Sequence, residues 1–208
     1  MSGVMLDADF FRRWMTGMAA AVDREADRLT ELDSAIGDAD HGANLRRGFA
    51  AVVKALEEEP SGTPGSLLVL AGRQLISTVG GASGPLYGTL LRRAGKALGD
   101  AAEVAPVQLA EALRVGVAAV AQLGGAKAGD KTMLDALEPA VEALAESLGE
   151  SFAAAADAAD QGALATVPMR ARKGRAGYLG ERSVGHQDPG AASAALLVAT
   201  LAAARGAR

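Results

Sequence analysis

The sequence has no cysteine among its 208 residues, which excludes disulfides, thiolate zinc sites and thiol catalysis. Aromatic residues make up only 3% of the chain although 50% of it is hydrophobic, so the core must be built from Ala, Leu, Val and Met. Alanine is the best helix former, and its small side chain lets helices pack closely. The composition therefore predicts an all-α fold. The length fits one domain or two very small ones, and we expect a single domain over residues 1–208.

An excess of positive charge is also absent, because 21 Lys and Arg against 25 Asp and Glu give a formal net charge of −4. A general nucleic-acid binder normally presents a dominant basic face, so no nucleic-acid partner is expected. No segment is judged long and apolar enough to cross a membrane, and residues 1–9 do not read as a signal peptide. We therefore expect a cytoplasmic protein with no membrane partner.

Apolar spacing and helix breakers divide the chain into about eight helices, and no segment shows the period-two alternation of a strand. The first helix can be capped by Asp7 or Asp9, and residues 60–65 form a linker of breakers. The first expected helix runs from residue 7 or 9 to about 32, and the sixth from an N-cap at Asp130 to about 148. The other expected helices cover approximately residues 43–58, 66–78, 85–99, 106–123, 151–171 and 191–205.

The most polar and glycine-rich connections follow the first, third, fifth and seventh of these helices. Short connections favour antiparallel neighbours, and in an up-and-down arrangement these four connections lie at the same end. The sequence therefore predicts one site built from four distant segments.

The first of these connections packs three aspartates, an imidazole and a carboxamide into residues 32–44. Asp33, Asp38 and Asp40 repel one another unless a cation lies among them. Hard oxygen ligands of this kind suit Mg²⁺, which fills its shell with water and phosphate oxygens. Their spacing does not place all three on one face of a helix, so we expect a loop that folds around the ion. An EF-hand is excluded because Phe49 stands where its bidentate glutamate belongs. Helix capping by Asp38 or Asp40 is the structural alternative.

The other three connections offer groups for a phosphate-bearing ligand. Residues 80–84 read Gly-Gly-Ala-Ser-Gly before a helix, where free amides suit an anion, although a simple linker is the alternative. Residues 124–132 approach a P-loop, but an aspartate separates Gly129 from Lys131 and no strand precedes them, which argues against a P-loop NTPase. Residues 172–190 form a long basic loop whose arginines can hold phosphates.

Together, the four connections resemble those of the ADP-binding L subunit of dihydroxyacetone kinase, the DhaL family. The resemblance covers nearly the whole chain, and four ordered motifs at compatible spacing are highly specific. It implies a closed up-and-down barrel of about eight antiparallel helices with the nucleotide at one rim. The motifs are residues 36–42 (IGDADHG), 80–86 (GGASGPL), 129–133 (GDKTM) and the run 171–190.

The resemblance also implies the site residues, with ADP or ATP and Mg²⁺, expected as a pair of ions, as cofactors. The metal ligands map onto Asp33, Asp38 and Asp40, which are also expected to be catalytic. His41 is expected to orient a ligand or phosphate, and Arg175 to screen phosphates or close the site. The expected nucleotide contacts are His41, Gly42, Ala43, Asn44, Ala82, Ser83, Gly124, Met133, Arg175, Asp188, Pro189 and Gly190.

The implied reaction is phosphoryl transfer to dihydroxyacetone. In the phosphotransferase-system type, ADP stays bound, a phosphohistidine on an M subunit recharges it, and dihydroxyacetone is held covalently by a K subunit. This chain carries no K domain, so it is expected to borrow its substrate site from a partner. Its freestanding length favours that type.

Several alternatives remain open. The chain can be an ATP-dependent kinase subunit for dihydroxyacetone or another short sugar, or the DhaL-like part of a fatty-acid kinase. It can also be a nucleotide-dependent, non-catalytic protein that binds a transcription regulator, although the intact aspartate triad argues against loss of catalysis. A purely structural helical domain leaves the four polar loops unexplained.

Overall fold

Helices dominate the computed structural model, which describes residues 4–59, 62–149 and 151–206. The all-α prediction is confirmed, and the sequence expectation of no strand is corrected only by β1 (Leu6–Asp7) and β2 (Glu103–Val104), which pair antiparallel. The helices of the described residues are α1 (Ala8–Ile36), α2 (His41–Glu57), α3 (Pro64–Thr78), α4 (Ser83–Leu98), α5 (Pro106–Gly124), α6 (Leu134–Glu146), α7 (Phe152–Ala165), the short η1 (Arg175–Ser183) and α8 (Pro189–Gly206).

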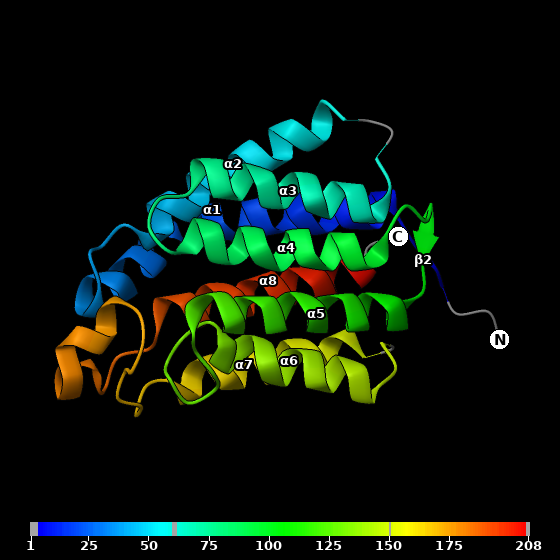
Figure 1. Ribbon diagram of the computed structural model, residues 1–208. Coiled ribbons are helices and arrows are strands. Elements are labelled where there is room, and N and C mark those ends of the chain that lie inside the picture. The colour runs from blue at the N-terminus through cyan, green and yellow to red at the C-terminus, as the bar shows by residue number, and fades with distance from the viewer. Residues whose placement is uncertain (1–3, 60–61, 150, 207–208) are drawn as a thin grey trace.

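The long helices follow one another around a ring. Each of them packs against the next in sequence, and α8 packs against α1, so the order of neighbours is circular and compatible with a closed barrel. In Figure 1 the helices run side by side, with the N and C labels at one end and η1, drawn in orange, at the other. The connections that follow α1, α3, α5 and α7 therefore gather at the η1 end.

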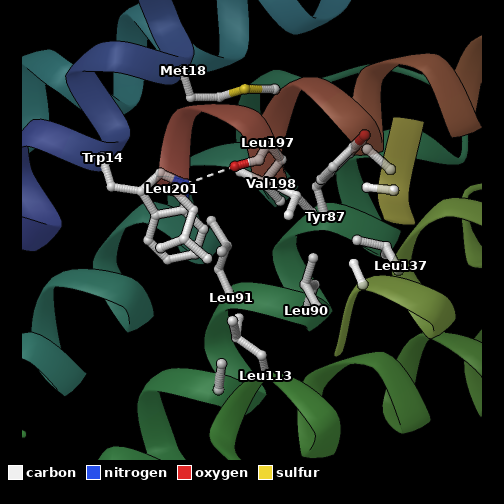
Figure 2. Packing of buried hydrophobic residues seen from close by; sticks show 14 of the residues in the cluster. Trp14, Met18, Tyr87, Leu90, Leu91, Leu113, Leu137, Leu197, Val198 and Leu201 are labelled. Atoms are coloured by element: carbon white, nitrogen blue, oxygen red, sulfur yellow. Dashed lines mark hydrogen bonds between the residues drawn. The ribbon is translucent and has the colours of Figure 1, made fainter. Parts of the chain in front are cut away.

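The apolar face of α1 forms one wall of the core. Asp7 caps the helix by accepting a hydrogen bond from the Phe10 N–H at 2.9 Å, as one of the two predicted caps. The Trp14 indole N–H donates to the carbonyl oxygen of Leu197 on α8 at 2.9 Å, as Figure 2 shows. A buried indole N–H needs such an acceptor, and this bond joins α1 to α8. Five apolar residues at helical spacing on this face are all buried: Phe10, Trp14, Met18, Val22 and Leu29.

One helix corrects the expectation about membrane spans. By length and composition α8 can cross a membrane, since its mean hydropathy is 1.2 over Pro189–Gly206. Half of this span is buried, and the helix packs against both α1 and α7. Its apolar character therefore serves the core of the ring.

Two predicted helix ends were wrong in ways that matter for the site. α1 continues to Ile36, which places Asp33 in its last turn rather than in a loop. α7 ends at Ala165 rather than near 171, because Pro168 disfavours a helical conformation in the residue before it. The segment between α7 and α8 is correspondingly longer than predicted.

Several helices also begin at other residues than predicted. α6 begins at Leu134, and Asp130 is not its N-cap, since its carboxylate accepts from the Lys127 N–H at 3.0 Å inside the preceding turn. α2 and α4 each begin about two residues earlier than predicted. The expected linker 60–65 is shortened because α3 begins at Pro64 with Thr63 as its cap, and residues 60 and 61 lie outside the described residues.

Candidate functional site

A cleft of about 400 Å³ opens at the η1 end, and all four polar connections contribute to its wall. The predicted convergence of these connections on one site is confirmed. The sequence-predicted site residues that line the cleft are Asp33, Asp38, Asp40, His41, Ala82, Ser83, Gly124, Met133, Arg175, Asp188, Pro189 and Gly190.

Three predicted nucleotide contacts do not line this cleft. Gly42 faces α1, where a Cβ atom would lie 1.9 Å from the carbonyl oxygen of Ala26. Ala43 is exposed, and the buried Asn44 accepts a hydrogen bond from Arg47 Nη2 at 2.8 Å. The structure gives Gly42 a packing role, and a nucleotide contact at these three residues stays a prediction.

Asp33 is fixed by the backbone at the start of α2. Its carboxylate is buried, with 8% of the residue exposed, and accepts from the N–H groups of Asp40 at 2.9 Å and His41 at 3.2 Å. Gly37 leaves the space that this carboxylate fills, since a Cβ there would lie 1.9 Å from Asp33 Oδ1. Helix capping does occur here, but Asp33 performs it, whereas Asp40 makes no side-chain cap bond.

The three aspartates form a cluster that fits a divalent cation. One carboxylate oxygen from each of Asp33, Asp38 and Asp40 lies within 4.8 Å of the others. The connection turns at Ala39, whose φ of +62° is uncommon for a residue with a Cβ atom. Such conformations cost free energy and cluster at functional sites. A set of carboxylates at this separation has the chemistry that Mg²⁺ prefers.

Arg175 reaches the aspartate cluster from η1. Its Nη2 lies 2.9 Å from Asp38 Oδ2 at the mouth of the cleft. The Arg175 and Asp38 side chains are 64% and 36% exposed, so the pair contributes about 0–1 kcal/mol to stability. Arg175 can therefore leave Asp38 and bind an anion at a small cost in free energy.

His41 lies inside a hydrogen-bonded network that joins α2, α4 and α8. Its Nε2 is 2.8 Å from Ser193 Oγ, and its Nδ1 is 3.1 Å from Ser83 Oγ. Ser193 Oγ donates to the carbonyl oxygen of Gly190 and is 2.6 Å from the Tyr87 hydroxyl. These contacts tie His41 to both serine hydroxyls, and the direction of each hydrogen bond depends on which ring nitrogen carries the proton.

Burial also affects the charge state of His41. Burial lowers the pKa of His41, and the nearby carboxylates of Asp33 and Asp40 only oppose that shift. The His41 ring holds the Ser83 hydroxyl through Nδ1. His41 thus orients Ser83 at the wall of the cleft.

Asp188 directly precedes α8 and lies in the wall of the cleft. Its carboxylate accepts from the Ala191 N–H at 2.7 Å, and its own N–H donates to Thr166 Oγ1 at 2.9 Å. Burial raises the pKa of Asp188 to about 7. Asp188, Pro189 and Gly190 were predicted to contact the nucleotide, and all three lie on the cleft wall.

Sequence reasoning missed Asp135, which shapes the connection between α5 and α6. Its two carboxylate oxygens accept from Gly129 N–H at 2.6 Å and Thr132 N–H at 2.7 Å. The Thr132-x-x-Asp135 spacing before an apolar run is a capping-box signal that identifies this role. Lys131, Tyr87 and Ser193 were also missed, because their partners are distant in sequence.

The comparisons with known proteins agree with this geometry. The sequence model of the DAK2 domain matches residues 35–203. The chain is 43% identical to the "PEP-dependent dihydroxyacetone kinase, ADP-binding subunit DhaL" of Escherichia coli strain K12, over 92% of this chain and 94% of that protein. It is 44% identical to the corresponding subunit of kinase 2 of Listeria innocua, over 95% of each.

A solved structure shares the fold. The dihydroxyacetone kinase from C. freundii in complex with AMP-PNP and Mg²⁺ superposes with a TM-score of 0.76 at 28% identity. The match covers 97% of this chain and 35% of that longer chain. From these matches and the four-loop cleft, the chain belongs to the DAK2-domain family and, within it, to the DhaL subunits.

Proposed function

We propose that this chain is the nucleotide-carrying subunit of a dihydroxyacetone kinase. It uses ADP or ATP with Mg²⁺ to transfer a phosphoryl group to dihydroxyacetone held on a separate K subunit. The observation that carries this proposal is the cleft in which a three-aspartate cluster, a glycine-rich helix start and an arginine meet. The ADP-binding subunits among its relatives support it.

The aspartate cluster would hold the metal. Asp33, Asp38 and Asp40 supply the oxygen ligands for a pair of Mg²⁺ ions, with Asp33 fixed by its two backbone hydrogen bonds. A metal held by these three carboxylates would supply the positive charge that neutralises the phosphate oxygens during transfer. Phosphoryl transfer depends mainly on such positioning and charge neutralisation, so the chain need not supply a nucleophile.

The rest of the cleft would hold the nucleotide. α4 begins at Ser83, so the backbone amides at Ala82 and Ser83 lie at the positive end of a helix and suit a phosphate. Met133, which also lines the cleft, offers an adaptable apolar surface for the base. Arg175 would close over the phosphates, exchanging its exposed contact with Asp38 for one with an anion.

We further propose that residues 1–208 form one DhaL-type domain that works in the cytoplasm. Its partners would be a dihydroxyacetone-binding K subunit and a phosphohistidine-carrying M subunit, with a transcription regulator as a third class. The intact aspartate triad supports catalysis over a purely regulatory role.

The phosphoryl donor is tested by reconstitution. The purified chain is mixed with a K subunit and dihydroxyacetone, and is supplied either with a phosphohistidine M subunit and its phosphoenolpyruvate-driven donors or with ATP. We expect sustained formation of dihydroxyacetone phosphate only with the phosphohistidine donor. No product with either donor would contradict the proposed function.

A second candidate is an ATP-exchanging subunit. The observation that favours it is the likeness to a kinase chain solved with AMP-PNP and Mg²⁺. Sustained turnover with ATP and no M subunit in the same reconstitution would select this candidate.

A further inference from the structure

Lys131 is a charged residue in the wall of the cleft, and only 1% of the residue is exposed. A buried ammonium needs polar partners, because an unpaired buried charge is costly. Lys131 Nζ donates to the carbonyl oxygen of Met169 at 3.0 Å and to that of Ser183 at 2.7 Å. The ammonium is therefore committed to the backbone of another segment.

The backbone that carries Lys131 is itself held firmly. The N–H groups of Gly129 and Thr132, on either side of it, both donate to the Asp135 carboxylate of α6. Lys131 has a φ of +64°, which is uncommon for a residue with a long side chain and needs support from its surroundings. The lysine is thus anchored to a helix rather than to a free loop.

The two carbonyl groups lie at the two ends of the segment 169–183, which contains Arg175. Ser183 Oγ accepts from the Ala171 N–H at 2.8 Å and donates to the Gly180 carbonyl oxygen at 2.7 Å, which closes the segment on itself. The Lys131 ammonium binds both ends of this closed segment at one point. It therefore joins the segment to the α5–α6 connection.

The contacts of Arg175 do not hold the segment by themselves. Arg175 and Asp38 are both solvent-accessible, and exposed ion pairs of this kind are weak. The Arg172 N–H adds one hydrogen bond to the Asp130 carbonyl oxygen at 3.1 Å. Lys131 makes the buried, charge-assisted contacts, which are the stronger kind.

We propose that Lys131 is a positioning residue that clasps both ends of segment 169–183 and so sets Arg175 at the mouth of the cleft. Its effect on bound nucleotide rests on the proposed function, whereas its effect on the segment does not. Removing the ammonium loosens the segment, which keeps its apolar contact with Ile36 of α1, and the nucleotide then leaves faster.

The first test uses limited trypsin digestion of the nucleotide-free protein. Lys131→Met keeps an unbranched side chain but removes the ammonium, and the exposed Lys127→Met is the matched control. Cleavage after the exposed residues Arg172, Lys173 and Arg175 is followed by mass spectrometry. We expect it to accelerate by about tenfold or more in Lys131→Met, as for the loss of a charged hydrogen bond, and to stay at the wild-type rate in Lys127→Met.

The second test measures release of labelled ADP from the same proteins with Mg²⁺ present. We expect Lys131→Met to release ADP about tenfold faster, in proportion to the opening of the segment. Wild-type cleavage in Lys131→Met would overturn the clasp, and faster cleavage with unchanged ADP release would overturn the positioning role. If wild-type protein binds no ADP, the proposed function fails, and the cleavage rates still decide whether the clasp exists.

Lys131→Gln keeps a neutral donor and covers the case in which the methionine variant does not fold. Segment 169–183 of this variant should be cleaved faster than in wild type but more slowly than a freely accessible segment. Its helical circular dichroism should be unchanged, which shows that the variant is folded. A wild-type cleavage rate in this variant would also overturn the clasp.

Discussion

Replacing Asp38 with asparagine is expected to lower phosphoryl transfer by on the order of a thousandfold, since a metal ion supplies several kcal/mol of charge stabilisation in the transition state. The substitution keeps the shape of the side chain and removes the negative charge that the cluster offers to a cation. Asp38 loses its exposed ion pair with Arg175, which contributes little to stability, so thermal stability should change little. Transfer is measured in the reconstituted system, and unfolding by circular dichroism.

The control for this variant is Asp157→Asn, which makes the same charge change at an exposed position on α7, away from the cleft. It should retain full transfer. Retained transfer in Asp38→Asn would remove the metal assignment, and equal losses in both variants would point to net charge as the cause.

A second large effect is expected on stability from Gly42→Ala. The new Cβ atom would lie 1.9 Å from the Ala26 carbonyl oxygen, which belongs to the backbone of α1 and cannot move independently of that helix. α2 must shift away from α1, which disturbs the backbone hydrogen bonds from Asp40 and His41 to Asp33. We expect a loss of about 1–3 kcal/mol in the free energy of unfolding. Urea denaturation measures it.

Gly17→Ala is the matched control because it makes the same substitution within α1. A Cβ atom there meets only Thr200 Cβ at 3.8 Å, an ordinary contact. Alanine in a helix interior is more stable than glycine by about 0.5–1 kcal/mol, so this variant should gain stability. The two substitutions are expected to change the free energy of unfolding in opposite directions. An unchanged free energy of unfolding in Gly42→Ala would show that α1 and α2 do not pack as closely as the structure indicates.

The helical fold and the end of the ring that holds the site were both predictable from sequence. Low aromatic content with abundant alanine, and the position of the polar connections after alternate helices, are properties of the chain itself. The convergence of Asp33, Ser83, Met133 and Asp188 on one cleft followed from that alternation. The roles of these residues came from a family resemblance, and in this chain they stay predictions.

What the sequence did not reveal depends on contacts between distant segments. Asp33 was predicted in a loop because the gap of five residues to Asp38 breaks helical spacing, yet α1 carries it and the turn at Ala39 brings the other aspartates back. In the sequence, Lys131 belongs to a motif that only partly matches a P-loop. Nothing in the local pattern indicates that its partners are the carbonyl groups of residues 169 and 183. Such pairings arise only when segments distant in sequence pack together in the fold.

The most direct measurement is the nucleotide and magnesium content of the freshly purified protein after denaturation. The account predicts about one ADP per chain together with magnesium, retained through purification as expected for a coenzyme that stays bound and is recharged in place. Protein that carries no nucleotide, and neither binds ADP nor ATP when they are supplied with Mg²⁺, would contradict it.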